Sequence, residues 1–164
     1  MQVLVSDTSV IIDLDRGSLI EDLFRLPYRF AVPDLLYRRE LEKQMGDRLV
    51  TLGLRVESLS PDEVRRATGL QRDRTQLSAP DTFAFAIAEA RGWPLLAGDG
   101  GLRSLAREKR LECHGVLWVC DQFEDGRHVP VARLHAGLAR ISTHRRCRLP
   151  AAEVRVRLER YALG

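Results

Sequence analysis

The sequence has few aromatic residues and no long apolar run. Aromatic side chains make up 6% of the 164 residues, so aliphatic side chains must fill most of the core. No segment approaches the roughly 20 consecutive apolar residues that a membrane helix needs. The apolar N-terminus is interrupted by Asp7 and Asp13, and no basic residue precedes it, which argues against a signal peptide. We therefore expect a cytoplasmic protein that does not enter a membrane.

Cysteine is also scarce, and its spacing predicts no structural role. The three cysteines, Cys113, Cys120 and Cys147, are odd in number and lack the C-x-x-C spacing of zinc sites and redox motifs. The four histidines show no metal-ligand spacing either. No glycine pattern matches a P-loop or a dinucleotide-binding turn. These absences argue against a disulfide framework, a zinc site and a nucleotide-binding loop.

Positive charge is concentrated near the end of the chain. Residues 127–164 hold nine arginines and two glutamates, whereas the rest of the chain has a net negative charge. A basic tail on an acidic body favours attraction to a polyanion such as nucleic acid. Only two of the 26 basic residues are lysine, however, so arginine is preferred throughout the chain. The alternative is therefore that the tail arginines only solvate helix faces.

Strands and helices alternate along the chain. Short apolar runs predict strands, and serine, aspartate and proline at helix starts predict the helices between them. We expect strands at residues 2–6, 29–32, 54–59, 94–97 and 111–114. In the first part of the chain we expect helices after Asp7 and at residues 19–26, 34–44, 61–72, 81–91 and 102–109, the third of them stopping near Gly46. From residue 116 we expect three more helices, separated at residues 126–130 and 148–150.

This alternation predicts an α/β fold with three layers, in which helices cover both faces of a central parallel sheet. Residues 1–115 form the expected catalytic core. Residues 116–164 form a helical C-terminal extension that we expect to pack on the same domain. Ligands of such sheets bind outside the carboxyl ends of the strands, so the chemistry is expected at that edge.

Four acidic residues are predicted to meet at this edge. Asp7 and Asp99 directly follow predicted strands, and Asp81 opens the buried helix that precedes the strand of Asp99. Glu40 lies on the helix that follows the second strand. Several adjacent carboxylates repel one another unless a cation neutralises them, and their hard oxygens favour Mg²⁺ or Mn²⁺. Such a site suits metal-assisted hydrolysis of a phosphodiester.

Each of these acids also has a simpler structural interpretation. Asp7 could serve as a helix cap and nothing more, and Asp81 could simply stabilise a helix dipole. Asp99 could simply be a turn residue. Glu40 could be a solvated surface acid. The metal-site hypothesis depends on their joint placement, since several acids at one sheet edge are far less expected than any one of them.

Three stretches resemble the PIN-domain family, in particular VapC-type toxins. VLVSDTSVIIDL resembles the family's first strand and aspartate, and VPDLLYRREL resembles the element that carries its glutamate, here Glu40. LSAPDTFAFAIAEARGWPLLAGDGGLRSLA is similar to the stretch that carries the last two aspartates, here Asp81 and Asp99. The resemblance covers roughly residues 1–115. It implies a PIN-like fold, a ribonuclease dependent on Mg²⁺ or Mn²⁺, frequent homodimers and a small antitoxin that blocks the acidic site.

The sequence also departs from this family pattern. Ala97-Gly98 stand where many members have threonine or serine, and Gly100-Gly101 stand where many have a further acid. One-metal and two-metal sites therefore both stay open. We assign Asp7, Glu40, Asp81 and Asp99 as catalytic and metal-binding residues. Thr8, Ser9 and Arg103 are assigned to substrate binding. Helix capping is an equal alternative for Thr8 and Ser9, and Arg103 could equally be an ordinary surface arginine.

The leading hypothesis is thus a metal-dependent endoribonuclease, a toxin of a toxin–antitoxin pair or a close relative. The main alternative is a non-catalytic PIN-fold module that binds nucleic acid or protein, which the glycines after Asp99 and the basic tail favour. A phosphatase of the haloacid-dehalogenase type ranks low, because Ser9 stands where that class expects its second aspartate.

Overall fold

A five-stranded, all-parallel sheet forms the centre of the computed structural model, which describes all 164 residues. Its order is β3-β2-β1-β4-β5, and each expected strand is present, though most are shorter than the apolar run that predicted them. The strands are β1 (Val3–Ser6), β2 (Arg29–Pro33), β3 (Arg55–Glu57), β4 (Leu95–Leu96) and β5 (Cys113–His114).

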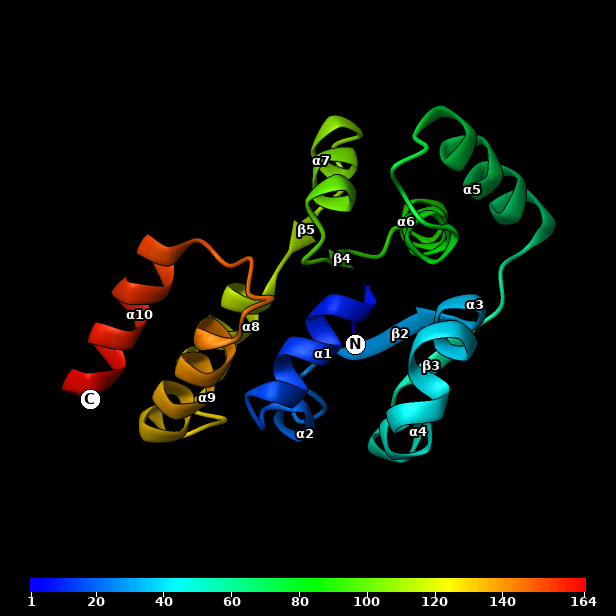
Figure 1. The fold of residues 1–164 in the computed structure, drawn as a ribbon. Helices are drawn as coiled ribbons and strands as arrows, with labels where there is room; N and C mark the ends of the chain where they lie inside the picture. Colours follow the sequence, from blue (N-terminus) through cyan, green and yellow to red (C-terminus); the bar gives the residue numbers. More distant parts are fainter.

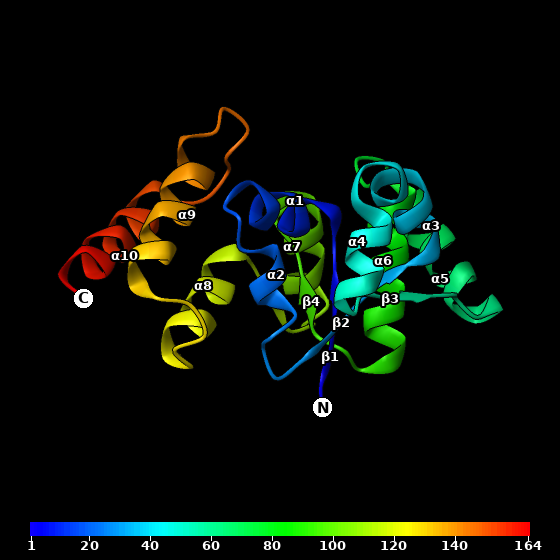
Figure 2. The same cartoon turned by 90° about the horizontal axis from the view of Figure 1, so that it is seen from below.

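Helices cover both faces of this sheet, which confirms the expected three-layer α/β/α fold with a helical C-terminal extension (Figures 1 and 2). The elements are α1 (Thr8–Arg16), α2 (Ile20–Leu23), α3 (Asp34–Leu36), the π-helix η1 (Tyr37–Gly46), α4 (Asp47–Leu52), α5 (Pro61–Asp73), α6 (Ala79–Arg91), α7 (Gly100–Glu108), α8 (Val116–Asp125), α9 (Val131–Thr143) and α10 (Ala151–Leu163). No helix combines the length and the apolar character that crossing a membrane requires.

The central strand β1 divides the core in two. Its successive side chains point to opposite faces, so Leu4 belongs to a cluster with α1, α2, α8 and α9, while Val5 belongs to a cluster with α5, α6 and α7. Helix α6 is apolar almost all round because it packs between the sheet and α5, burying Phe85 and Ile87.

The sheet's topology determines where a ligand can enter. The chain runs outward from β1 to β2 and β3, and then crosses back to place β4 on the other side of β1. The carboxyl ends of β1 and β4 therefore form the point where strand order reverses, which is where α/β sheets bind ligands. Asp7 and Asp99 follow these two strands.

The structure corrects the expected helix stop near Gly46. The helical segment continues through Gly46 to Leu52, and its middle part is the π-helix η1. A Cβ atom at position 46 would lie 2.6 Å from the Tyr37 hydroxyl, so glycine here makes room for that ring within the helix rather than ending it. Because a π-helix is wound more widely than an α-helix, side-chain spacing along Tyr37–Gly46 does not follow the α-helical period assumed from sequence.

A second correction concerns the end of α9. The sequence predicted a break at residues 148–150, but α9 ends at Thr143 and residues 144–150 are not helical. Local bonds compete with the helix here: the Thr143 hydroxyl donates to the Ala139 carbonyl at 2.9 Å, and the Arg146 amide donates to His144 Nδ1 at 3.1 Å. The arginines that follow therefore lie on a loop.

The C-terminal extension packs on α1 and α2. Leu138 and Ile141 of α9 and Tyr161 of α10 belong to the same buried cluster as Leu14 of α1. The backbones of α9 and the α1–α2 connection meet at Gly137 and Gly17, where a Cβ at either position would lie 3.0 Å or less from the other's carbonyl oxygen. The division of the chain at residue 115 stays a proposal, since both parts contribute to one cluster.

Candidate active site

Asp7 is held rigidly at the carboxyl end of β1. Its side chain is buried, with 1% of its surface exposed. Oδ1 accepts a hydrogen bond from the Val10 amide at 3.0 Å, which makes Asp7 the N-cap of α1. Oδ2 accepts from the Ser9 hydroxyl at 2.8 Å and from the Gly98 amide at 2.9 Å. Asp7 is therefore both a helix cap and the link between β1 and the loop after β4.

Gly98 makes this link possible. A Cβ atom at position 98 would lie 2.5 Å from the Ser9 hydroxyl oxygen, so any side chain there would push away the hydroxyl that bonds Asp7. The loop can then approach α1 closely enough for the Gly98 and Asp99 amides to donate to Asp7 Oδ2, the second at 3.3 Å. The glycine at this position, a departure from the family pattern, thus serves the close packing of two loops.

Asp99 and Asp81 each stand at a helix start that faces Asp7. Asp99 caps α7, and its Oδ2 accepts from the Leu102 amide at 2.9 Å. Asp81 lies in the first turn of α6, behind the N-cap Ser78, whose hydroxyl accepts from the Asp81 amide at 3.2 Å. The capping interpretation of Asp7 is therefore correct, and Asp99, for which the sequence offered a turn, is also a helix cap. Capping leaves oxygen lone pairs of both aspartates available for a ligand.

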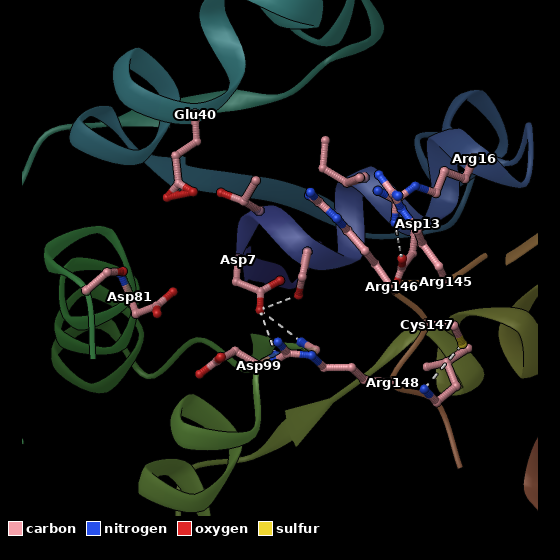
Figure 3. Close-up of a pocket in the computed structure, with 16 residues that line it drawn as sticks. Asp7, Asp13, Arg16, Glu40, Asp81, Asp99, Arg145, Arg146, Cys147 and Arg148 are labelled. Carbon is pink, nitrogen blue, oxygen red and sulfur yellow. Dashed lines mark hydrogen bonds and ion pairs between the residues drawn. The ribbon is translucent and has the colours of Figure 1, made fainter. Parts of the chain in front are cut away.

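Glu40 approaches the same space from the opposite side. It lies in the first turn of η1 and is exposed, and its carboxylate makes no hydrogen bond or ion pair with the protein. Figure 3 shows its side chain extending toward the region between Asp7 and Asp81. Glu40 is therefore not held by the protein, whereas four hydrogen bonds hold the Asp7 carboxylate.

One pocket of about 640 Å³ collects these side chains. Of the seven residues assigned from sequence, six line it: Asp7, Thr8, Ser9, Glu40, Asp81 and Asp99. The seventh, Arg103, does not, because its guanidinium donates to the Ala97 carbonyl at 2.9 Å and lines a separate cavity with Arg107 and Cys113. The structure therefore gives no geometric support to Arg103 as a substrate contact at this pocket.

Thr8 has a feature that its neighbour lacks. The Ser9 hydroxyl is used to hold Asp7, whereas the Thr8 hydroxyl oxygen is buried and has no hydrogen-bond partner. A buried polar atom without a partner is costly unless a ligand or water supplies one. Because Thr8 lines the pocket, its hydroxyl is suited to bond an oxygen of a bound ligand.

Several pocket residues were not assigned from the sequence. Asp13 and Arg16 of α1 line the pocket and form an ion pair at 3.4 Å, and Ser78 and a loop of arginines at 145–148 complete the wall. The helical spacing of Ser9, Asp13 and Arg16 places all three on one face of α1, and that signal was available in the sequence. The arginine-rich tail was evident in the sequence, but no local pattern indicated which arginines would reach the pocket. Arg145, Arg146 and Arg148 were expected on or next to a helix and lie instead on a loop.

The electrostatics reflect the crowding of acids. Burial raises the pKa of Asp7, although hydrogen bonds from Val10, Gly98 and Ser9 oppose the rise. Burial also raises the pKa of Asp81 to about 6, and the negative charges of Asp99, Asp7 and Glu40 add to that effect. The four carboxylates therefore share one electrostatic environment, as a cation-binding site requires.

These residues fit a hard divalent cation in their chemistry. All of the acidic donors are carboxylate oxygens, and the mutual repulsion at Asp81 is what a bound cation would relieve. As the side chains stand, no three carboxylate, imidazole or thiol groups lie close enough together to surround one ion. The residues that would hold such an ion are Asp7, Glu40, Asp81 and Asp99.

The raised pKa of Asp81 predicts how stability depends on pH. Between its ordinary value of 3.8 and about 6, the folded protein binds a proton at Asp81 that the unfolded chain releases. The contribution of Asp81 to stability therefore falls as pH rises through this window. In metal-free buffer we expect Asp81→Asn to melt at a higher temperature than the wild type at pH 7.5, with the difference shrinking toward pH 4.5.

Thermal unfolding of both proteins across this pH range measures the effect. Asp73→Asn, which makes the same change at an exposed aspartate at the end of α5, is the control. A difference between Asp81→Asn and the wild type that is the same at pH 4.5 and pH 7.5 would contradict the assigned pKa.

Comparison with known proteins places this arrangement in context. A family model described as a PIN domain matches residues 3–162, so the match spans both the sheet and the helical extension. No curated protein matches the sequence. Among solved structures, the chain is similar to a toxin–antitoxin complex from Klebsiella pneumoniae, with 18% identity and a TM-score of 0.42 over 58% of this chain and 86% of that chain.

Proposed function

The chain belongs to the PIN-domain family, and we propose that it is a metal-dependent endoribonuclease that hydrolyses RNA phosphodiester bonds in the pocket around Asp7. One observation carries the proposal. Four carboxylates from four separate segments of the chain, Asp7, Glu40, Asp81 and Asp99, line a single pocket at the carboxyl edge of the sheet. PIN domains are generally nucleases, and this arrangement is the acidic site that such chemistry needs.

Each residue has a defined task in this proposal. Asp7, Asp81, Asp99 and Glu40 would hold Mg²⁺ or Mn²⁺, which supplies an activated water and a Lewis acid for the phosphoryl oxygen. Asp7 orients the site, because its hydrogen bonds to α1 and to the loop after β4 fix its carboxylate before substrate arrives. Thr8 offers its hydroxyl, buried and without a partner, to a phosphate oxygen.

Metal binding is the first prediction of this function. Calorimetric titration with Mn²⁺ is expected to show binding to the wild type, and Asp81→Asn is expected to lower the affinity at least about tenfold, since it removes a charged oxygen donor. Asp73→Asn is the matched control, because it removes the same charge from the exposed end of α5.

Cleavage of a labelled single-stranded RNA should stop in chelator and return when Mn²⁺ or Mg²⁺ is added. Undiminished cleavage in chelator would overturn the metal-dependent mechanism. Tight Mn²⁺ binding without cleavage of any RNA would overturn the nuclease assignment, but the proposed metal site would still stand.

A non-catalytic module that binds nucleic acid is the second candidate. The arginines at the pocket favour it, as do the glycines at 100 and 101 in place of a further acid. The same titration separates the two, because a binding module need not take up metal at this edge of the sheet.

The toxin role, an antitoxin partner and a homodimer form the remaining part of the proposal, and their support is the resemblance of the sequence to VapC-type toxins. A cytoplasmic location agrees with three free cysteines. A small reading frame next to the gene, whose product co-purifies with this chain and suppresses cleavage, is the expected observation.

A further inference from the structure

The loop between α9 and α10 forms one wall of the pocket. Arg145, Arg146 and Arg148 on this loop line the pocket, together with Arg16 of α1. Figure 3 shows Arg145 and Arg146 away from Glu40 and Asp81, beside Asp13 and Arg16, which pair with each other. The Arg148 side chain reaches toward Asp99 in the same view. The loop therefore adds positive charge to the part of the pocket that lies away from Glu40 and Asp81.

The three loop arginines make no ion pair. Three other arginines of the tail are neutralised: Arg157 binds Asp121 at 2.7 Å, Arg160 binds Glu124 at 2.7 Å, and Arg133 binds Asp22. The loop arginines stay unpaired although several carboxylates line the same pocket. Three more tail arginines also form no ion pair, but they lie outside the pocket: Arg127, Arg140 and Arg155. What distinguishes the loop arginines is therefore that three unpaired guanidinium groups gather at one pocket.

The loop has a defined shape despite lying outside the helices. The Arg146 amide donates to His144 Nδ1 at 3.1 Å, and the Leu149 amide donates to Cys147 Sγ at 3.4 Å. Leu149 is half-buried against the larger hydrophobic cluster. The loop is therefore anchored at both ends, and its exposed arginine side chains extend from a held backbone.

Guanidinium groups in this position suit phosphate. Arginine stays protonated at every physiological pH, and its planar fork donates two hydrogen bonds to one phosphate. No aromatic side chain lines the pocket, so bases have no stacking surface there. Recognition by this wall is thus directed at the sugar–phosphate backbone rather than at base identity.

On these grounds we propose that Arg145, Arg146 and Arg148 bind the backbone phosphates of single-stranded RNA that flank the bond to be cleaved. This inference rests on the proposed function, since it names the substrate contact of the same pocket. We expect a single strand, because Asp7 is 1% exposed and a flexible backbone bends toward a buried side chain more easily than a stiff duplex does.

Binding is measured by fluorescence anisotropy with a labelled 12-nucleotide RNA, in an Asp99→Asn background that prevents cleavage. The test variant replaces all three loop arginines by glutamine. The control removes equal charge from three exposed arginines that make no ion pair and lie outside the pocket: Arg72→Gln, Arg127→Gln and Arg155→Gln.

We expect the test variant to bind at least about tenfold more weakly than the control at moderate salt, with the slope of log affinity against log salt reduced by about 2, because three phosphate contacts are lost. In the active protein, KM should rise with little change in kcat. Equal affinity of test and control variants would overturn the proposal. So would faster cleavage by the test variant, because the arginines would then be shielding the acids.

The two proposals can fail separately. If the wild type cleaves RNA and the test variant matches the control in KM and affinity, the arginine proposal is wrong and the nuclease proposal stands. If the wild type cleaves no RNA but the test variant loses single-strand binding, the nuclease proposal is wrong and the arginine proposal stands. An equal loss of affinity for a 12-base-pair duplex would overturn the assignment to single strands.

Discussion

Asp99→Asn is expected to reduce RNA cleavage by about a thousandfold while leaving the fold intact. Asp99 caps α7 through Oδ2, and asparagine caps a helix as well as aspartate does, since its amide oxygen can accept the same bond from the Leu102 amide. The substitution therefore removes only the negative charge that faces the pocket.

Asp7→Asn would be a less informative change. Both oxygens of Asp7 accept hydrogen bonds, and an amide nitrogen in place of Oδ2 would face the amides of Gly98 and Asp99. Two buried donors that face each other without an acceptor lower the free energy of unfolding by about 1–3 kcal/mol. A loss of activity in this variant could therefore come from the missing charge or from the lower stability.

Initial rates on a labelled single-stranded RNA, with melting temperature measured in parallel, check the Asp99 prediction. Asp73→Asn should keep the wild-type rate, because it carries the same change away from the pocket. If Asp99→Asn cleaves RNA at the wild-type rate, Asp99 has no catalytic role and the proposed site is wrong.

Gly137→Ala is expected to destabilise the protein by about 1–3 kcal/mol, the cost of overpacking a close contact. A Cβ at this position would lie 2.8 Å from the Gly17 carbonyl oxygen and 2.9 Å from the Leu19 side chain. A backbone oxygen cannot rotate away as a flexible side chain can, so α9 must shift away from the α1–α2 connection. Since α9 leads directly into the arginine loop, RNA affinity should fall as well.

Gly69→Ala is the matched control for this prediction. Gly69 lies inside α5, and a Cβ there meets nothing within 4 Å. Alanine in a helix interior is favoured over glycine by roughly 0.8–1.0 kcal/mol, so this variant should melt at a higher temperature than the wild type. Chemical denaturation measures both effects, and a Gly137→Ala protein at least as stable as the wild type would contradict the close contact.

Much of the fold could be predicted because the signals are local. Valine-rich and leucine-rich runs indicated the strands, and Ser60-Pro61 indicated the start of α5, where Ser60 and Glu63 bond to each other's backbone amides. The two failures have local causes too. Gly46 accommodates the Tyr37 ring instead of ending the helix, and α9 ends at Thr143 because the backbone of His144 is extended.

Four of the five acids that line the pocket were expected there from the sequence, and Asp13 was not. Strand ends located Asp7 and Asp99, parallel topology located Asp81, and the family resemblance added Glu40; all four line one pocket. The physical reason is that the carboxyl ends of parallel strands must share one edge, so order along the chain determines position in space.

The positions of the basic side chains depended on tertiary structure. The sequence showed a surplus of arginine after residue 126, but it could not tell which of those side chains would find partners. Packing of α9 and α10 against α1, α2 and α8 pairs Arg133, Arg157 and Arg160 with acids and leaves Arg145, Arg146 and Arg148 at the pocket. Ion pairing between distant segments is decided by how helices dock, and no local pattern of residues encodes that.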